Sequence, residues 1–187
     1  LTHIDCRAFR NCSNLEKITF GNDQLTVSPD AFKNCTTLKY IELPDGTQYE
    51  LSGLPTYAVS AVPSLIRMIH KQILSNFFIS GTMLVEYRGS EERVVIPDGI
   101  TIIGERAFAG NEAIGRIILP ESVLEIHEEA FADCLLLQKI NLPEHLQRMD
   151  QSAFENCVKL IQIDLPESLE ELADSVFNRC TKLNAIH

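Results

Sequence analysis

Several features that would mark common functional classes are missing from this sequence of 187 residues. Acidic side chains outnumber basic ones by 26 to 16, so the formal net charge is −10 and the basic footprint of a nucleic-acid-binding protein is absent. No apolar run is long enough to span a bilayer. No glycine-rich loop of the kind that holds phosphate occurs. We therefore expect neither a nucleic-acid partner nor membrane insertion.

Patterns for catalysis and metal binding are missing as well. Nucleophilic catalysis needs a Ser or Cys close to a His, and no spacing in the sequence ties such residues together. Zinc sites that use cysteine commonly include histidine, and no histidine shares the cysteine positions described below. The sequence thus predicts no catalytic residue, no metal site and no cofactor. The first residue is Leu and no signal-peptide pattern follows it, which we interpret as a cut end.

What the sequence does contain is an internal repeat. A phenylalanine recurs with a step of 23 residues inside each of two groups, as Phe9 and Phe32, then as Phe108, Phe131, Phe154 and Phe177. A small or β-branched residue precedes each phenylalanine, Cys or Asn follows three positions later, and Leu or Ile follows six and nine positions later. Repeats of this length predict a solenoid, in which neighbouring repeats bury each other's apolar faces.

The pattern inside one repeat predicts its local structure. The residue before the phenylalanine, the phenylalanine itself and the residues three and six positions later have the spacing of a short helix face. The Ile-x-Leu that follows alternates like a strand, and proline ends four of these strands. Stacked repeats about 4.8 Å apart would form a parallel sheet. The short segment from Val123 to Ile126 predicts a second, smaller sheet.

These motifs resemble the BspA-type leucine-rich repeat family. The resemblance lies in Ile-Pro-Asp-Gly-Ile-Thr-Ile-Ile-Gly-Glu-Arg-Ala-Phe (Ile96 to Phe108) and in Ala-Phe-x-x-Cys-x-x-Leu followed by Ile-x-Leu-Pro. It covers about residues 1–44 and 77–187. It implies an α/β leucine-rich-repeat solenoid, and a non-enzymatic module of a bacterial surface or secreted protein. The implied partner is a protein or glycan on a host or neighbouring cell.

The repeat is interrupted between Phe32 and Phe108. We expect leucine-rich repeats at 1–48 and 92–187, separated by a helical insertion and hairpin at 49–91. A helix is predicted from Pro63 to Asn76, with an apolar stripe that fits either of two roles. It either covers the open end of a repeat stack or binds a partner or membrane surface. Residues 77–87 predict a hairpin or paired strands.

Five of the six cysteines share one position of the repeat, three residues after the phenylalanine: Cys12, Cys35, Cys134, Cys157 and Cys180. In stacked repeats they would point in the same direction, which disfavours disulfides. We expect buried, reduced thiols that act as small hydrophobes. Cys6 lies at another position of the repeat, so we expect it to be the most exposed thiol.

Carboxylates form a further column, one residue after the turn proline: Asp98, Glu121, Glu144 and Glu167. Calcium needs more converging oxygen ligands than one column supplies, so we interpret this column as a solvated turn.

The outward positions of the strands supply the candidate binding residues. In the second group of repeats they form a basic row of Arg93, Arg116 and Lys139 beside a row of Val95, Ile118 and Asn141. Solenoids commonly use an exposed sheet for recognition, so these six residues are the predicted binding site. Two alternatives stay open: the cations neutralise nearby carboxylates, or the chain is a structural spacer in a larger surface protein.

Overall fold

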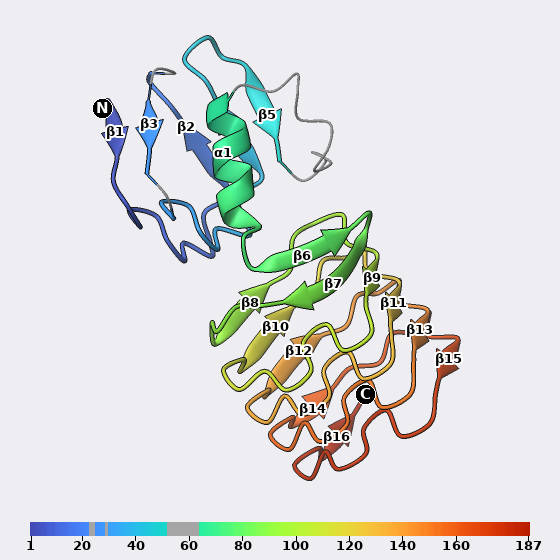
Figure 1. Ribbon diagram of the computed structural model, residues 1–187. Coiled ribbons are helices and arrows are strands. Elements are labelled where there is room, and N and C mark those ends of the chain that lie inside the picture. Colours follow the sequence, from blue (N-terminus) through green and yellow to red (C-terminus); the bar gives the residue numbers. More distant parts are fainter. Residues whose placement is uncertain (23–24, 29, 52–63) are drawn as a thin grey trace. The chain divides into compact units, whose positions relative to one another are not determined.

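The computed structural model describes residues 1–22, 25–28, 30–51 and 64–187 (Figure 1). The chain divides into two compact units, Leu1–Asn76 and Phe77–His187, here called unit 1 and unit 2. The segment 49–91, predicted as one insertion, is thus shared between the units. In each unit consecutive turns of 23 residues stack through parallel strands, which confirms the predicted solenoid.

Unit 1 contains one helix, α1 (Ser64–Ile73), and short strands. The strands are β1 (His3–Ile4), β2 (Lys17–Thr19), β3 (Thr26–Val27), β4 (Tyr40–Glu42) and β5 (Gln48–Glu50). β1 pairs with β3 and β2 pairs with β4, both in parallel, and β5 joins β4 in antiparallel orientation. The predicted helix start, Pro63, lies outside the described residues.

Unit 2 places its strands on two sides of the winding chain (Figure 1). On one side lie β8 (Arg93–Val95), β10 (Arg116–Ile118), β12 (Lys139–Asn141), β14 (Gln162–Ile163) and β16 (Ala185–Ile186). The other side forms one six-stranded sheet of β6 (Phe77–Ser80), β7 (Met83–Tyr87), β9 (Ile102–Ile103), β11 (Glu125–Ile126), β13 (Arg148–Met149) and β15 (Glu171–Leu172). The predicted second sheet therefore exists, but the prediction that it is the smaller one is wrong.

The short helix predicted around each phenylalanine is also wrong, because this segment forms consecutive turns. The residues two before and two after each phenylalanine have positive φ, which breaks an α-helical hydrogen-bond ladder. Backbone N–H groups bond along the stacking axis instead: the N–H of Phe131 donates to the carbonyl of Ala153 in the next turn (2.8 Å). The position two after the phenylalanine is Asn, Asp or Gly in most turns, residue types that tolerate this conformation.

A stack of aromatic rings runs through the core of unit 2. The rings of Phe108, Phe131 and Phe154 are fully buried or nearly so, and neighbouring centroids lie 5.0–5.1 Å apart. The cysteine column lies beside them, and the Sγ of Cys134 donates to the carbonyl of Phe108 at 3.3 Å. Stacking thus buries both columns, as their common spacing predicted.

Helix α1 covers the end of the unit 1 stack, as the first of its two interpretations predicted. Ile66 and Ile69 are fully buried in the unit 1 core. The Gln72 side chain accepts a hydrogen bond from the N–H of Phe32 (2.9 Å) and donates one to the carbonyl of Ser28 (3.1 Å). Asn76 donates to Asn34, which donates to Asn11. The helix therefore supplies the polar groups that another turn would supply.

Unit 2 begins with the predicted hairpin, in which β6 and β7 are antiparallel. β7 then pairs in parallel with β9, so the hairpin joins the solenoid directly. Tyr87 occupies the place of the repeat phenylalanine: its ring lies between those of Phe77 and Phe108, with centroids 5.1 Å from each. The hairpin is therefore the first layer of the unit 2 core.

Candidate binding surface

The strands β8, β10 and β12 bring the six predicted binding residues together on one surface, here called the basic face. Arg116 is paired in register with Arg93 on one side and Lys139 on the other. Ile118 is likewise paired with Val95 and Asn141. Val94, Ile117 and Ile140 between them are buried, so the alternation of the strands turns both rows outward.

The three cations of the basic face stand on adjacent strands about 4.8 Å apart. Like charges at this distance repel each other by at most about 0.9 kcal/mol in water. Among the residues that the structure describes, Arg116 and Lys139 make no ion pair or side-chain hydrogen bond. Neutralisation by nearby carboxylates therefore does not explain these two cations.

A paired cation occupies the same strand position in unit 1. Lys17 on β2 forms an ion pair of 2.6 Å with Glu42, which lies diagonally across on β4. In unit 2 the corresponding diagonal positions hold Ile118 for Arg93 and Asn141 for Arg116. The strands of the basic face thus carry no carboxylate at the diagonal position that Glu42 occupies in unit 1.

The second row of the basic face is partly apolar. Val95 and Ile118 are half-buried and present aliphatic surface beside the cations. Asn141 is exposed, but its amide is already engaged: it accepts from the N–H of Leu119 (2.9 Å) and donates to the carbonyl of the same residue (3.0 Å). One N–H and one oxygen lone pair of this amide remain for a ligand.

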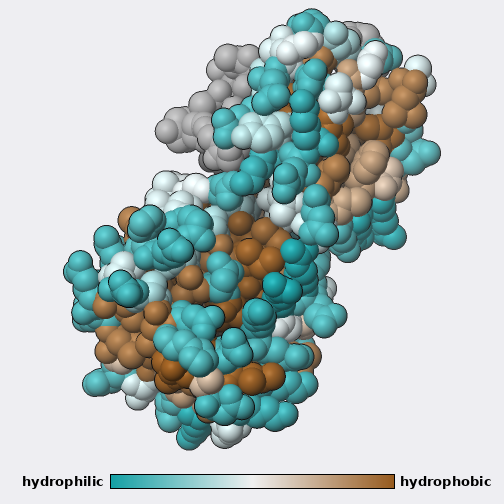
Figure 2. All heavy atoms as spheres, turned by 180° about the vertical axis from the view of Figure 1, so that it is seen from behind, coloured by the Kyte–Doolittle hydropathy of each residue, from teal (hydrophilic) through white to brown (hydrophobic). Residues whose placement is uncertain are grey.

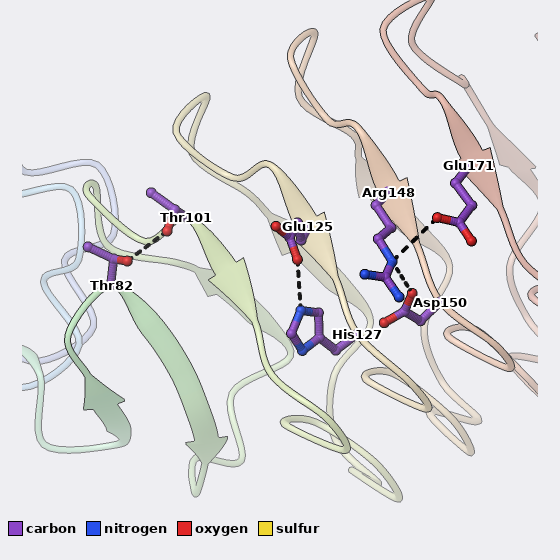
Figure 3. A network of polar contacts seen from close by, with 7 residues as sticks. All are labelled: Thr82, Thr101, Glu125, His127, Arg148, Asp150 and Glu171. Atoms are coloured by element: carbon purple, nitrogen blue, oxygen red, sulfur yellow. Dashed lines mark hydrogen bonds and ion pairs between the residues drawn. The ribbon is translucent and has the colours of Figure 1, made fainter.

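The opposite sheet of unit 2 carries charges that pair with one another (Figure 3). Arg148 bonds to Asp150 (2.6 Å) and lies 3.7 Å from Glu171, while His127 Nε2 lies 3.0 Å from Glu125. The contact between Arg148 and Glu171 joins β13 to β15, whereas the other two each join residues of the same turn. Charges that are already paired attract a charged ligand less strongly than Arg116 and Lys139 of the basic face, which make no ion pair with a described residue.

No sequence motif connects His3 with Ser28, yet the two side chains meet where β1 lies beside β3. The Nε2 of His3 lies 3.0 Å from the Ser28 hydroxyl and 3.3 Å from the Asp5 carboxylate. A catalytic relay needs the acid on the other ring nitrogen, but Nδ1 contacts the Thr26 hydroxyl. The geometry of a Ser-His-Asp triad is therefore not formed here.

The remaining polar columns are exposed. Asp98, Glu121, Glu144 and Glu167 all lie at the surface, and the backbone N–H of Glu144 donates to Glu121. In the described part of the chain, no group of three potential metal ligands is close enough to hold an ion. No helix within the described ranges is long and apolar enough to cross a membrane.

The cysteines follow their predicted environments. Cys35, Cys134, Cys157 and Cys180 are buried, Cys12 is half-buried and Cys6 is exposed, and none of the six forms a disulfide. Burial raises the pKa of the Cys134 thiol to about 12 and that of Cys35 to about 11. The thiolate, the reactive form, is therefore disfavoured at these buried positions.

The BspA type leucine rich repeat region matches in six copies over residues 1–80 and 85–187. The chain belongs to the BspA-type leucine-rich repeat family. Proteins built from these repeats are typically scaffolds without enzymatic activity, and this membership points to an interaction or surface module. No curated protein matches the chain in sequence.

Solved structures of other leucine-rich repeat proteins are similar to this chain. A Treponema pallidum leucine-rich repeat protein shares 25% identity (TM-score 0.53) over 60% of this chain and 68% of its own. A Bacteroides capillosus protein shares 25% (TM-score 0.52) over 60% and 97%. The pneumococcal vaccine antigen PcpA shares 21% (TM-score 0.56) over 92% and 38%. The last similarity supports the fold alone.

Proposed function

We propose that this BspA-type chain is a non-enzymatic binding module of a bacterial surface or secreted protein, and that it recognises a protein or glycan partner through the basic face. The observation that carries the proposal is the in-register row of Arg93, Arg116 and Lys139, in which Arg116 and Lys139 make no ion pair with any described residue. An acidic ligand would relieve the repulsion along this row.

The rigidity of the strands supports the same role. Each cation projects from a strand whose backbone is paired on one or both sides and whose neighbouring residue is buried. The backbone of such strands is already ordered, so binding costs only the rotamer freedom of the cationic side chains, about 0.5–1.5 kcal/mol for each. Arginine can also hold a carboxylate or sulfate with two parallel hydrogen bonds.

The test is a charge reversal with a matched control. Arg93, Arg116 and Lys139 are changed together to Glu, and a control variant carries the same change at Lys33, Lys159 and Lys182, which lie elsewhere. Both are assayed against extracellular-matrix proteins and sulfated glycans. We expect the first variant to lose binding at least tenfold and the control to keep it, with binding by the parent weakening as salt rises.

Two results would contradict the proposal. If the folded reversal variant binds as tightly as the parent, the basic face is not the site. If the parent binds nothing on the panel, the structural-spacer function is favoured instead.

A further inference from the structure

The basic face offers two parallel rows, and their dimensions restrict what fits. Along the stacking axis, the three cations span two strand spacings, about 9.6 Å. Across the strands, Val95 and Ile118 lie two residues beyond Arg93 and Arg116, about 6.6 Å away. A partner that uses the whole face therefore needs a charged row and an apolar row side by side.

An α-helix lying along the stacking axis has these dimensions. Side chains at positions i, i+3 and i+7 lie on one stripe and span about 10.5 Å at a rise of 1.5 Å per residue. Positions i+4 and i+8 form a neighbouring stripe on the same side of the helix. An extended strand fits less well, since three side chains on one of its faces span about 13.6 Å.

The aliphatic row favours a protein partner over a glycan. A sulfated glycan would use the cations but leave the apolar surface of Val95 and Ile118 without a matching partner. The six residues of the face include no aromatic ring on which a sugar could stack. Burying aliphatic side chains against apolar groups contributes about 25 cal/mol per Å².

The neighbouring strand limits how far a ligand can extend along the basic face. β14 continues the row with Gln162 instead of a cation, and Asp164 follows in the apolar column. A carboxylate at Asp164 would repel an acidic ligand that extended farther along the axis. The face therefore fits about two helical turns.

We propose that the basic face binds an acidic amphipathic α-helix of a protein partner, with carboxylates over Arg93, Arg116 and Lys139 and apolar side chains over Val95 and Ile118. This inference rests on the proposed function and names the class of partner.

The probe is a synthetic, helix-favouring peptide with Glu at i, i+3 and i+7 and Leu at i+4 and i+8. A control peptide has the same composition in scrambled order, so its net charge is equal. Binding to the 187-residue chain is measured by fluorescence anisotropy, and peptide helicity by circular dichroism. We expect the patterned peptide to bind at least tenfold more tightly than the scrambled one and to gain helicity.

Two sets of variants assign this binding to the two rows. The reversal of Arg93, Arg116 and Lys139 to Glu should weaken peptide binding at least tenfold, while the Lys33, Lys159 and Lys182 control should not. The double variant Val95→Thr and Ile118→Thr keeps β-branched side chains on the strands but adds hydroxyls. It should weaken peptide binding at least fivefold and change the binding of heparin, a sulfated glycan, less than twofold.

The outcomes separate this inference from the proposed function. If heparin or a matrix protein binds through the cations while the two peptides bind equally weakly, the proposed function stands and the helix is wrong. If the threonine variant weakens peptide and heparin equally, the apolar row is not specific for a helix, which also overturns the inference. If no probe binds the parent, both proposals fail.

Discussion

Units 1 and 2 use the same repeat but differ at the same position of their strands. In unit 1 a cation, Lys17, is paired with Glu42 on the next strand. In unit 2 Arg116 lies between two other cations and has Asn141 in the diagonal position. Stacking does not depend on either arrangement, because it rests on inward side chains such as Ile41 in unit 1 and Ile117 in unit 2, which are both fully buried. The proposed function assigns this difference to ligand binding on the surface of unit 2.

The two units also differ in how their stacks end. The end of unit 1 is covered by α1, whose Gln72 satisfies backbone groups of the last turn. In the last turn of unit 2, Leu172 and Ile186 are 48% and 56% exposed, although the equivalent residues of the preceding turns are buried. Exposed apolar side chains are visible among polar ones in a view of the surface (Figure 2).

The largest expected effect is the loss of a central ring. Phe154→Ala should lower the free energy of unfolding of unit 2 by about 3–5 kcal/mol, because the ring is fully buried between two others. Phe9→Ala in unit 1 should cost less, since Phe9 is only partly buried.

The chain has no tryptophan, so Tyr49→Trp would report on unit 1 and Phe177→Trp on unit 2 in urea titrations. A loss below about 1 kcal/mol for Phe154→Ala contradicts the stack.

Removing the polar groups of the helical cap should have the next largest effect. Gln72→Met keeps the length of the side chain but leaves the N–H of Phe32 and the carbonyl of Ser28 without this partner. We expect unit 1 to lose about 1–3 kcal/mol and unit 2 to be unchanged. Equal losses in the two units, measured with the same tryptophan reporters, would contradict this role of α1.

Alkaline pH should weaken unit 2 more than unit 1. Burial raises the pKa of Cys134 from 9.0 to about 12 and raises that of Cys157, while in unit 1 it raises that of Cys35 to about 11. The unfolded thiols ionise near pH 9 while the folded ones keep their protons. The contribution of these thiols to stability should therefore be constant below about pH 8, and between pH 9 and the folded pKa it should fall by about 1.4 kcal/mol per pH unit for each buried thiol.

The control for this pH dependence is the double variant Cys134→Ala and Cys157→Ala. It should reduce the slope of unit 2 between pH 9 and pH 10 and leave that of unit 1 unchanged. Identical slopes for parent and variant would show that these thiols are not responsible.

The smallest effects should come from the surface cations themselves. Lys17→Met removes one exposed ion pair, which is worth about 0–1 kcal/mol. Arg116→Met removes a cation that has only like charges as in-register neighbours, so it should leave stability unchanged or raise it slightly. Urea titrations of both variants check the sign, and a loss above 1 kcal/mol for Arg116→Met would mean that this side chain stabilises the fold.

Periodicity made most of the repeat architecture predictable. The 23-residue step fixed which side chains share a column, so the register of Arg93, Arg116 and Lys139 and the burial of Cys134 followed directly. The turn around each phenylalanine did not follow, because apolar spacing alone does not reveal two residues with positive φ. The residue types that could have indicated positive φ were the Asn, Asp and Gly two positions after the phenylalanine.

The 23-residue periodicity did not predict which residues cover the ends of the stacks, or which charged residues form ion pairs. Tyr87 lies 21 residues before Phe108, so its place in the aromatic stack breaks the 23-residue step. Gln72 and Asn76 replace backbone and side-chain groups of a turn without sharing its sequence. Which cations are paired depends on side-chain reach across strands, as the bond between Lys17 and Glu42 shows.

The most direct test makes unit 2 resemble unit 1. Ile118→Glu places a carboxylate diagonal to Arg93, in the relation that Glu42 has to Lys17, and Thr19→Glu adds the same charge to the equivalent strand position of unit 1. The dissociation constant of each variant is measured for the tightest ligand of the matrix-protein and sulfated-glycan panel. If the row of cations on unit 2 creates the binding site, Ile118→Glu weakens binding at least tenfold and Thr19→Glu leaves it unchanged. Equal affinity of the parent and folded Ile118→Glu would contradict that claim.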